Sequence, residues 1–337
     1  MSVRRLFTPS STDAEVLDAA TVGRTDVLDT LAGRIRSAAR DGSRPHTLVI
    51  AAPGAGKTHT CRVAAHRALT DPDTAKAVLA VPLSEDALGI GSYADLLVEI
   101  ARGVGPELGE QARALRRAKD PVGIEALIVD AAAGRMVLLL IDNLGRVFDG
   151  IGASGQGSMR AWVETSAAVT VLATAPALFP GVSSREYPWY GSFMIESLPP
   201  LTDTDAAALL RLAARHRGDD KLVAYLRSPD GGADVAALHR VVGGAPRMWH
   251  LLSECADPDS IAALTPAVEA LLDRLAPQLQ QRLGSLPTGE QRPVGIGHED
   301  HLRVFHVEGE LSRAAEPPAI TADRRPTPLP RKAVGNG

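Results

Sequence analysis

The sequence contains little that would direct it to a membrane or to an oxidising compartment. Its 337 residues include only two cysteines, Cys61 and Cys255, which is too few for a disulfide framework. The longest strictly apolar runs are short: Met136–Ile141 has six residues, whereas a membrane span needs about 18. The first residues, MSVRRLFTPSSTDAE, carry two arginines but no apolar signal-peptide core. We therefore expect a cytoplasmic protein with no membrane partner.

The chain also lacks a strong excess of either charge. It has 36 Lys and Arg against 40 Asp and Glu, a net charge of −4. This balance argues against a uniformly basic coat for nucleic acid but leaves a local basic face open. With 23% charged and 45% hydrophobic residues, the composition excludes wholesale disorder, and the length indicates one large and one smaller domain. One basic stretch, which we interpret as a solvated helix face, contains Arg113, Arg116, Arg117 and Lys119.

Short apolar runs in the first part of the chain predict an α/β domain. Continuous apolar runs of this length are typical of parallel strands covered by helices on both faces. A Gly-rich turn follows the first run, and a helix is expected from about Lys57 to Leu69. Pro82 indicates that the strand expected at Val78–Leu83 ends at the proline or lies at an edge of the sheet. We expect strands at Thr47–Ile50, Val78–Leu83, Met136–Ile141 and Val169–Thr174, and a short one at Phe193–Ile195.

Strand patterns stop after Leu198, and helical patterns separated by Gly, Pro and Asp predict a small α-helical domain. Further on, apolar periodicity weakens and five prolines lie among charges, so we expect a weakly structured or disordered tail. The predicted organisation is an extension over 1–20, an α/β domain over 21–198, a helical domain over 199–288 and a tail over 289–337. The expected helices are Ala206–Ala214, Lys221–Leu226, Val235–Val241, Met248–Glu254 and Pro266–Leu286.

A phosphate-binding loop lies between the first predicted strand and its helix. The segment AAPGAGKT matches Gly-x-x-x-x-Gly-Lys-Ser/Thr, except that Ala51 stands where the first glycine is usual. Gly54 and Gly56 let backbone N–H groups converge on a phosphate at the N-terminus of the helix. Lys57 can bridge the terminal phosphates, and the hydroxyl of Thr58 can bind Mg²⁺. A Gly-rich turn that only joins strand to helix is the alternative; the motif and its context favour nucleotide binding.

A candidate metal ligand follows the strongest predicted strand. The segment LLLIDN places Asp142 at the carboxyl end of a buried strand, where open α/β sheets bind ligands. A carboxylate there can complete the Mg²⁺ shell together with Thr58. The alternative is that Asp142 caps the N-terminus of the next helix. The upstream phosphate loop favours the metal role.

The order of these motifs resembles the AAA+ and STAND group of P-loop ATPases, particularly bacterial relatives of origin-recognition ATPases. The resemblance runs from about Thr21 to Leu286, with AAPGAGKT as Walker A and LLLIDN as Walker B. It implies a P-loop parallel sheet between helices, a helical lid, and ATP and Mg²⁺ as cofactors. The segment TVGR is similar to a box that touches the adenine in that family. Nucleotide binding is thereby assigned to Val22, Gly23, Arg24, Pro53, Gly54, Ala55, Gly56, Lys57, Thr58 and His59, and Mg²⁺ binding to Thr58 and Asp142.

The resemblance also assigns catalytic roles. Thr174 in LATAP stands at the position of the sensor-1 residue, which contacts the γ-phosphate or the lytic water. Arg247 in GGAPR is similar to the sensor-2 arginine of the lid, and a surface arginine after a Gly–Pro turn is the alternative. One charge-assisted contact to the γ-phosphate, worth about 1.5–3 kcal/mol, would favour ATP over ADP. The predicted catalytic set is Lys57, Asp142, Asn143, Thr174 and Arg247.

Asn143 departs from the family pattern, in which many members carry Glu after the Walker B aspartate. An amide can orient water but cannot accept its proton, so we expect slow hydrolysis or a base from elsewhere. Glu85 is a candidate base, with an exposed loop acid as the alternative. Arg185 and Arg160 are candidates for an arginine finger, although a surface role is favoured for each.

The remaining sequence patterns do not indicate a further binding or catalytic site. A winged-helix DNA reader is not evident after the lid, and the HEDH segment at His298 lacks metal-site spacing. The aromatic cluster of Tyr187, Trp189, Tyr190 and Phe193 is interpreted as packing in the core or at the lid interface, with a partner-binding patch as the alternative. We expect an ATP-binding switch ATPase that couples its lid to a partner, with a nucleotide-bound interaction module as the alternative and a small-molecule kinase as a third reading. A homo-oligomer, an unidentified protein and DNA remain open as partners.

Overall fold

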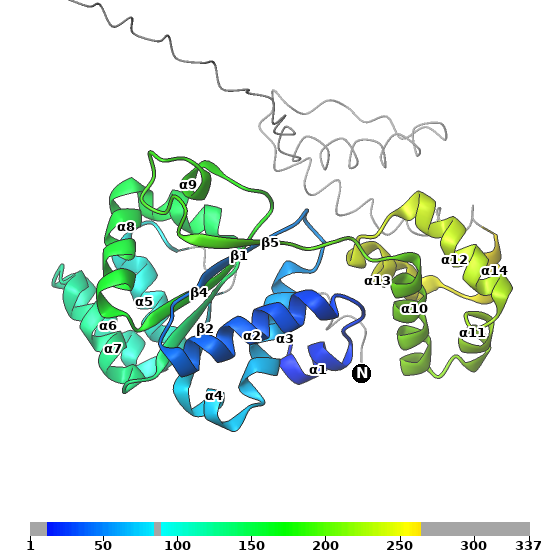
Figure 1. Cartoon of the computed structure of the whole chain (residues 1–337), viewed down its shortest axis with the longest axis horizontal. Helices are drawn as coiled ribbons and strands as arrows, with labels where there is room; N and C mark the ends of the chain where they lie inside the picture. The colour runs from blue at the N-terminus through cyan, green and yellow to red at the C-terminus, as the bar shows by residue number, and fades with distance from the viewer. Residues whose placement is uncertain (1–11, 84–88, 264–337) are drawn as a thin grey trace, which may run out of the picture. The chain divides into compact units, whose positions relative to one another are not determined.

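The computed structural model describes residues 12–83 and 89–263, and a five-stranded parallel sheet forms its centre (Figure 1). The strand order is β2-β3-β4-β1-β5, and Val49 of β1 lies opposite Thr174 on one side and Glu196 on the other. The predicted fold class is confirmed, and Pro82 lies in the edge strand β2, as expected. The strands are β1 (His46–Ile50), β2 (Val78–Leu83), β3 (Met136–Ile141), β4 (Val169–Ala175) and β5 (Phe193–Ser197).

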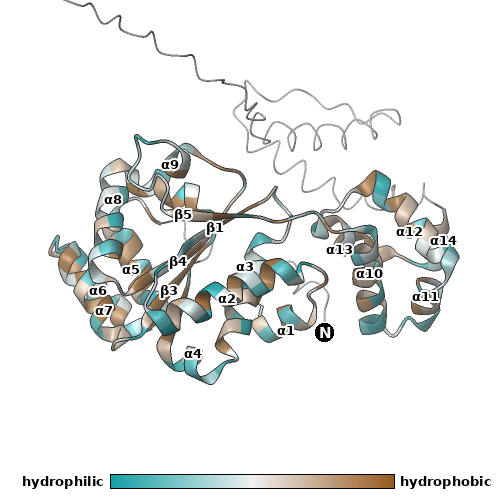
Figure 2. Cartoon of the chain, viewed as in Figure 1, coloured by the Kyte–Doolittle hydropathy of each residue, from teal (hydrophilic) through white to brown (hydrophobic). Residues whose placement is uncertain are grey.

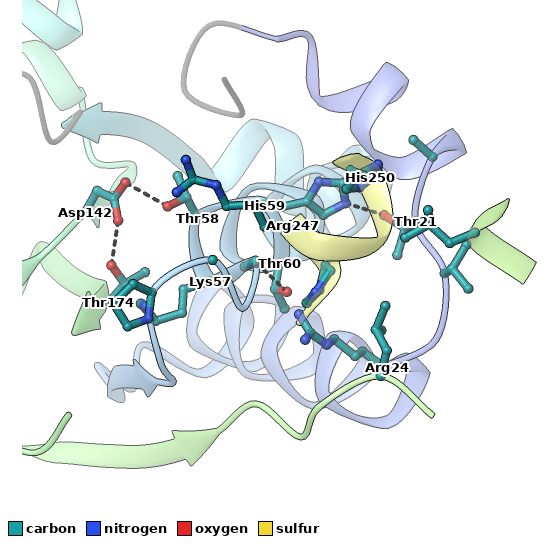
Figure 3. Close-up of a pocket in the computed structure, with 18 of the residues that line it drawn as sticks. Thr21, Arg24, Lys57, Thr58, His59, Thr60, Asp142, Thr174, Arg247 and His250 are labelled. Carbon is teal, nitrogen blue, oxygen red and sulfur yellow. Dashed lines mark hydrogen bonds between the residues drawn. The ribbon is translucent and has the colours of Figure 1, made fainter. Parts of the chain in front are cut away.

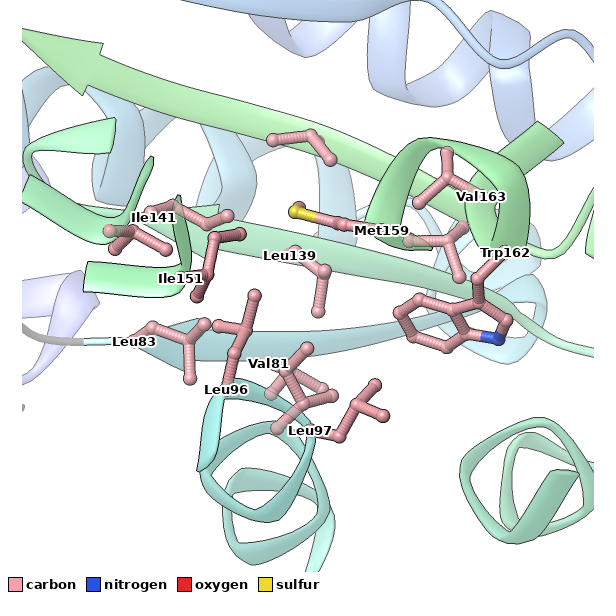
Figure 4. Close-up of a cluster of buried hydrophobic side chains, with 14 of the residues drawn as sticks. Val81, Leu83, Leu96, Leu97, Leu139, Ile141, Ile151, Met159, Trp162 and Val163 are labelled. Carbon is pink, nitrogen blue, oxygen red and sulfur yellow. The ribbon is translucent and has the colours of Figure 1, made fainter. Parts of the chain in front are cut away.

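Both faces of the sheet are covered, which explains the unbroken apolar run of β3. Leu139 and Ile141 pack into one cluster with Trp162 (Figure 4), whereas Met136 and Leu138 pack into a second cluster on the other face. Because successive side chains of a strand point to opposite faces, burial on both sides requires apolar residues at every position.

The first face is covered by α5 (Tyr93–Val104), α6 (Pro106–Arg117), α7 (Pro121–Ala132), α8 (Leu144–Ser166) and the short α9 (Pro180–Ser183). The second is covered by α1 (Ala14–Ala19), α2 (Thr25–Asp41) and α3 (Lys57–Leu69), and α4 (Pro72–Ala77) joins α3 to β2.

Local sequence accounts for many helix ends. α3 begins immediately after Gly56, whose φ is 84°, and α2 ends at Gly42, whose φ is 74°; both values favour glycine. Proline occupies the first turn of α4, α6, α7 and α9, where its missing N–H costs no helical hydrogen bond. Between Leu83 and Met136 the sequence predicted only the helix face of the basic stretch, and the structure places α5, α6 and α7 in this interval.

Five described helices follow β5, and each presents an apolar side to its neighbours (Figure 2). Trp249 is buried among them, stacks on His239 with ring centroids 5.8 Å apart, and donates through Nε1 to the carbonyl of Gly243 at 2.7 Å. Thr202 and Asp205 form a capping box, so the first of these helices begins before the predicted Ala206. The helices are α10 (Asp203–Arg217), α11 (Asp220–Tyr225), α12 (Pro229–Val242), α13 (Pro246–Cys255) and α14 (Pro258–Ala262).

The helix expected at Pro266–Leu286 and the tail expected over 289–337 lie outside the described residues. The predicted domain boundaries therefore remain predictions. In the part that the structure describes, no helix combines the length and apolarity that a membrane crossing requires. Cys61 is a buried free thiol.

Candidate nucleotide-binding site

The loop between β1 and α3 curls through two left-handed glycines. Gly54 has φ 79° and Gly56 has φ 84°, a region that residues with a side chain rarely adopt. The ammonium group of Lys57 folds back over the loop and donates to the carbonyls of Ala51 at 2.6 Å and Ala52 at 3.0 Å. The loop therefore has the strand–turn–helix geometry that presents backbone N–H groups to an anion.

Asp142 links the loop helix to the neighbouring strands. Its Oδ2 accepts a hydrogen bond from Thr58 Oγ1 at 2.7 Å, and its Oδ1 accepts one from Thr174 Oγ1 at 2.6 Å (Figure 3). The backbone N–H of Asn143 donates to Thr174 Oγ1 at 3.0 Å. These groups meet because β3, β4 and β1 are adjacent and parallel, so their carboxyl ends share one edge of the sheet.

This arrangement excludes one of the two interpretations of Asp142. The N-cap position of α8 is occupied by Asn143, in a left-handed conformation with φ 57°, so the alternative role of Asp142 as that cap is wrong. Its carboxylate instead faces two hydroxyl groups, and such hard oxygen ligands suit Mg²⁺. We call Thr58, Asp142 and Thr174 the metal end of the site.

Arg24 connects the loop to the segment that leads into α10. Its guanidinium donates to the carbonyl of Ala55 at 2.5 Å and to the carbonyl of Pro199 at 3.2 Å. Burial lowers the pKa of Arg24, and the nearby carboxylate of Asp205 counteracts part of this shift. Pro199 and Asp205 had no role in the sequence analysis because no motif marks them.

Arg247 lies against the phosphate loop. A Cβ atom added to Gly54 would be 3.2 Å from the Cβ of Arg247, and the backbone N–H of Arg247 donates to the carbonyl of Gly54 at 3.3 Å. Arg247 belongs to the first turn of α13, directly after Pro246. A residue nearly 200 positions away in sequence is thus placed beside the loop (Figure 3).

A cavity of about 730 Å³ extends from the metal end to a second region, the base end, defined by Thr21, His59 and His250. Figure 3 shows Asp142 and Thr174 on one side of the loop and Thr21 and His250 on the other. His59 Nε2 lies 2.8 Å from Thr21 Oγ1. No sequence motif includes His250, although its position three residues after Arg247 on one helix places both on the same face.

Both histidines are neutral near pH 7. Burial lowers the pKa of His59 to about 4, with smaller contributions from His250 and Arg24. Burial likewise lowers the pKa of His250 to about 4. The base end is thus uncharged at its two imidazoles, whereas the metal end carries a carboxylate.

The two arginine-finger candidates lie outside this cavity. Arg160 pairs with Glu164 at 2.6 Å on α8, and the guanidinium of Arg185 lies 5.8 Å from the ring centroid of Tyr190. Neither lines the cavity. The candidate base Glu85 and the HEDH segment lie outside the described residues. Among the residues that are described, no group of three or more His, Cys, Asp or Glu side chains could hold a metal ion by itself.

The other patterns have structural explanations. In the basic stretch, Arg113 pairs with Glu110, and Arg116 pairs with Asp95 at 2.5 Å, as expected for a solvated helix face. Trp189 is buried and contacts Phe193, with ring centroids 5.4 Å apart, which agrees with its interpretation as packing.

No protein-family model matches the chain, and no curated protein matches its sequence. Among solved structures, ORC2 of Aeropyrum pernix, determined as ADPNP–ADP complexes, is similar with a TM-score of 0.56 at 14% identity. The match covers 85% of this chain and 86% of the ORC2 chain. Drosophila ORC bound to DNA is similar with a TM-score of 0.53 at 14% identity, and the match covers 92% of this chain and 81% of the Drosophila chain. ORC1 of A. pernix in complex with DNA is similar with a TM-score of 0.52 at 15% identity, and the match covers 89% of this chain and 80% of the ORC1 chain. These likenesses show the fold of the origin-recognition AAA+ ATPases, as the motif order implied.

Proposed function

We propose that this chain, which has the origin-recognition AAA+ fold, binds Mg·ATP in the cavity and changes its lid contacts with nucleotide state. The observation that carries the proposal is the hydrogen-bonded set Thr58–Asp142–Thr174 beside a loop of phosphate-binding geometry. A Gly-rich connection alone would not need a carboxylate and a second hydroxyl at this position. The ADPNP–ADP complexes of the A. pernix ORC2 structure support the choice of an adenine nucleotide.

In this proposal the triphosphate lies along the loop N–H groups and the N-terminus of α3. Lys57 exchanges its bonds to the carbonyls of Ala51 and Ala52 for phosphate oxygens, and this exchange keeps its ammonium group satisfied. Thr58 and Asp142 hold Mg²⁺, which neutralises charge on the terminal phosphates. Val22, Gly23, Arg24 and the loop from Pro53 to His59 complete the predicted binding residues.

Hydrolysis is expected to be slow. Thr174 and Asn143 are joined by a hydrogen bond and can orient a water molecule near the γ-phosphate. Neither side chain can accept a proton near pH 7, so no general base is present among these groups. The catalytic roles assigned to Lys57, Asp142, Asn143, Thr174 and Arg247 are part of the proposal.

The lid coupling is proposed to act through Arg247 and Arg24. Arg247 contacts the loop from α13, and Arg24 bonds both the loop and Pro199, which leads into α10. A ligand shifts a conformational equilibrium only by its difference in affinity for the two states. A γ-phosphate contact with Arg247 supplies such a difference between ATP and ADP.

A second candidate is a nucleotide-bound interaction module that does not turn over at a useful rate, and Asn143 favours it. Incubation with Mg·ATP, at high protein concentration and with and without DNA, separates the two. Phosphate release that the Lys57→Ala variant abolishes supports the switch ATPase, and no release in any condition supports the module. DNA is included because two of the similar structures are DNA complexes. A cytoplasmic location, a homo-oligomer and an unidentified protein partner remain proposals.

Calorimetric titration with Mg·ATP and Mg·ADP tests nucleotide binding itself. We expect Lys57→Ala to weaken ATP binding at least about tenfold, because it removes a charge-assisted contact to the phosphates. Lys76→Ala, on the exposed surface of α4, is the matched control and should bind as the unaltered chain does. Equal ATP affinity in all three proteins would remove the proposed site.

A further inference from the structure

The first turn of α3 separates the two ends of the cavity. Thr58 and His59 are consecutive, so their side chains leave the helix about 100° apart. Thr58 points to Asp142 at the metal end, whereas His59 points to Thr21 (Figure 3). With the phosphates on the loop and Mg²⁺ at the metal end, the base of a bound nucleotide would extend toward His59; the cavity is also lined by Leu28, Leu209 and Leu251.

A chain of hydrogen bonds fixes the tautomer of His59. The hydroxyl of Thr21 donates to the carbonyl of Leu17 at 2.8 Å, and a carbonyl can only accept. The hydroxyl has a single hydrogen, so its oxygen must accept from His59 Nε2 across the 2.8 Å between them. The proton of the imidazole is therefore on Nε2, which leaves Nδ1 with a lone pair.

A neutral imidazole carries a single proton, so with that proton on Nε2 the other ring nitrogen, Nδ1, can only accept a hydrogen bond. Among the described residues, no donor forms a hydrogen bond with Nδ1, and His59 lines the cavity. The wall of the base end thus presents one hydrogen-bond acceptor of fixed character.

We propose that His59 determines base specificity: its Nδ1 accepts a hydrogen bond from the 6-amino group of adenine and disfavours the 6-oxo group of guanine or hypoxanthine. The inference rests on the proposed nucleotide site. Thr21 is the positioning residue, because its bond to the carbonyl of Leu17 denies His59 the other tautomer.

The expected discrimination follows from elementary hydrogen bonding. Adenine offers a donor at position 6, whereas a 6-oxo purine offers an acceptor that faces the lone pair of Nδ1. A buried polar group left without its partner costs about 1–3 kcal/mol, equivalent to roughly 5–150-fold in affinity. A site built to bond one group rejects the analogue that lacks it.

The first test compares four triphosphates on the unaltered chain by calorimetry: those of adenosine, inosine, guanosine and purine riboside. We expect the affinity to fall from adenosine to purine riboside, which lacks a 6-substituent, and to fall again to inosine, at least about tenfold below adenosine. Inosine avoids the 2-amino group of guanosine, so its loss reports the 6-oxo group together with the hydrogen that the 6-oxo form carries on N1, and purine riboside, which keeps N1 as an acceptor, reports the missing 6-amino group. Equal binding of the adenosine and inosine forms would overturn the inference while leaving the nucleotide site intact; no binding of any triphosphate would overturn the proposed function itself.

The second test changes the tautomer without changing the contact residue. Thr21→Val removes the hydroxyl, so His59 can place its proton on Nδ1 and donate to a 6-oxo group. We expect the preference for adenosine over inosine triphosphate to fall about tenfold, mainly through tighter inosine binding. Thr30→Val, at an exposed hydroxyl that bonds within α2, should keep the preference and serves as the control.

His59→Phe keeps an aromatic ring but removes the acceptor, so it should weaken adenosine binding and leave inosine binding nearly unchanged. A preference that survives both Thr21→Val and His59→Phe would overturn the assignment. If Thr21→Val does not fold, the series of triphosphates on the unaltered chain still decides.

Discussion

The two ends of the cavity are constructed differently. At the metal end, Asp142 bonds two hydroxyl groups that come from adjacent parts of one parallel sheet and its loop helix. At the base end, Thr21, His59 and His250 come from three stretches that no sheet pairing connects, namely the segment before α2, the helix α3 and the helix α13. The first end depends on strand order, and the second depends on packing between separate elements.

The two ends also differ in electrostatics. The metal end has the side chain of Asp142, whose two oxygens accept hydrogen bonds, whereas the base end has two imidazoles that burial keeps neutral. Changes at the metal end should therefore alter the dependence of binding on Mg²⁺. Changes at the base end should alter base choice and the response of the protein to acid.

The largest effect is expected from Asp142→Asn, which keeps hydrogen bonding to the two threonines but removes the charge. Removing a residue that only hydrogen-bonds to a metal ligand lowers metal affinity about 10–100-fold. Asp142 is itself the proposed ligand, so we expect the increase in ATP affinity that Mg²⁺ causes to be at least about 100-fold smaller in the variant. Titration of ATP with and without Mg²⁺ measures this gain. The control is Asp149→Asn, an exposed acid on α8. An unchanged Mg²⁺ dependence would show that the two ends are not chemically distinct.

Arg247 tests whether the lid contributes to the metal end. Arg247→Ala should reduce the preference for ATP over ADP by about tenfold to a hundredfold and leave ADP affinity nearly intact, because only ATP offers a γ-phosphate. Calorimetry with both nucleotides measures the ratio. The exposed Arg215 on α10 provides a matched control as Arg215→Ala. Equal losses for ATP and ADP would contradict the role of Arg247 in sensing the terminal phosphate.

Acid should act on the base end. The folded-state pKa of His59 and of His250, each lowered to about 4, lies below the value of about 6.5 for an unfolded histidine. The folded state thus binds these protons less well, so stability is complete above pH 6.5 and is lost as the pH falls toward 4. The loss at pH 5 is about 2 kcal/mol for each histidine.

Urea unfolding at pH 7.5 and pH 5 measures this loss, and His250→Gln should reduce it by about 2 kcal/mol. Burial also lowers the pKa of His46 to about 4, and this histidine lies at the start of β1, so part of the acid effect should remain in that variant. His216→Gln, at an exposed position on α10, should leave the acid loss unchanged. If the His250→Gln variant lost as much unfolding free energy between pH 7.5 and pH 5 as the unaltered chain, His250 would not contribute to the acid sensitivity.

Much of the metal end could be predicted from the sequence. The motif AAPGAGKT and the acid after an apolar strand identify Thr58 and Asp142, because phosphate loops and strand ends have strong local patterns. The match of α3 to the predicted Lys57–Leu69 reflects the same locality. Glycines at left-handed positions and prolines in first turns likewise mark the ends of elements within a few residues.

The base end could not be predicted in the same way. His250 and Pro199 are not part of any motif, and the tautomer of His59 depends on a threonine 38 residues away. No apolar run marks α6, and the short apolar runs inside α5 and α7 are interrupted by single acidic residues, Glu99 and Glu125, so the search for continuous apolar runs assigned neither helix.

The sequence by itself determined the five strands, the curled loop with the helix that follows it and the acid at the end of β3, because these depend on local conformational preference and on apolar runs. Only the tertiary structure decided that Arg24 reaches Pro199, that Arg247 lies against Gly54 and that His59 faces Thr21. Such contacts join residues distant in the chain, and their geometry depends on how whole elements pack.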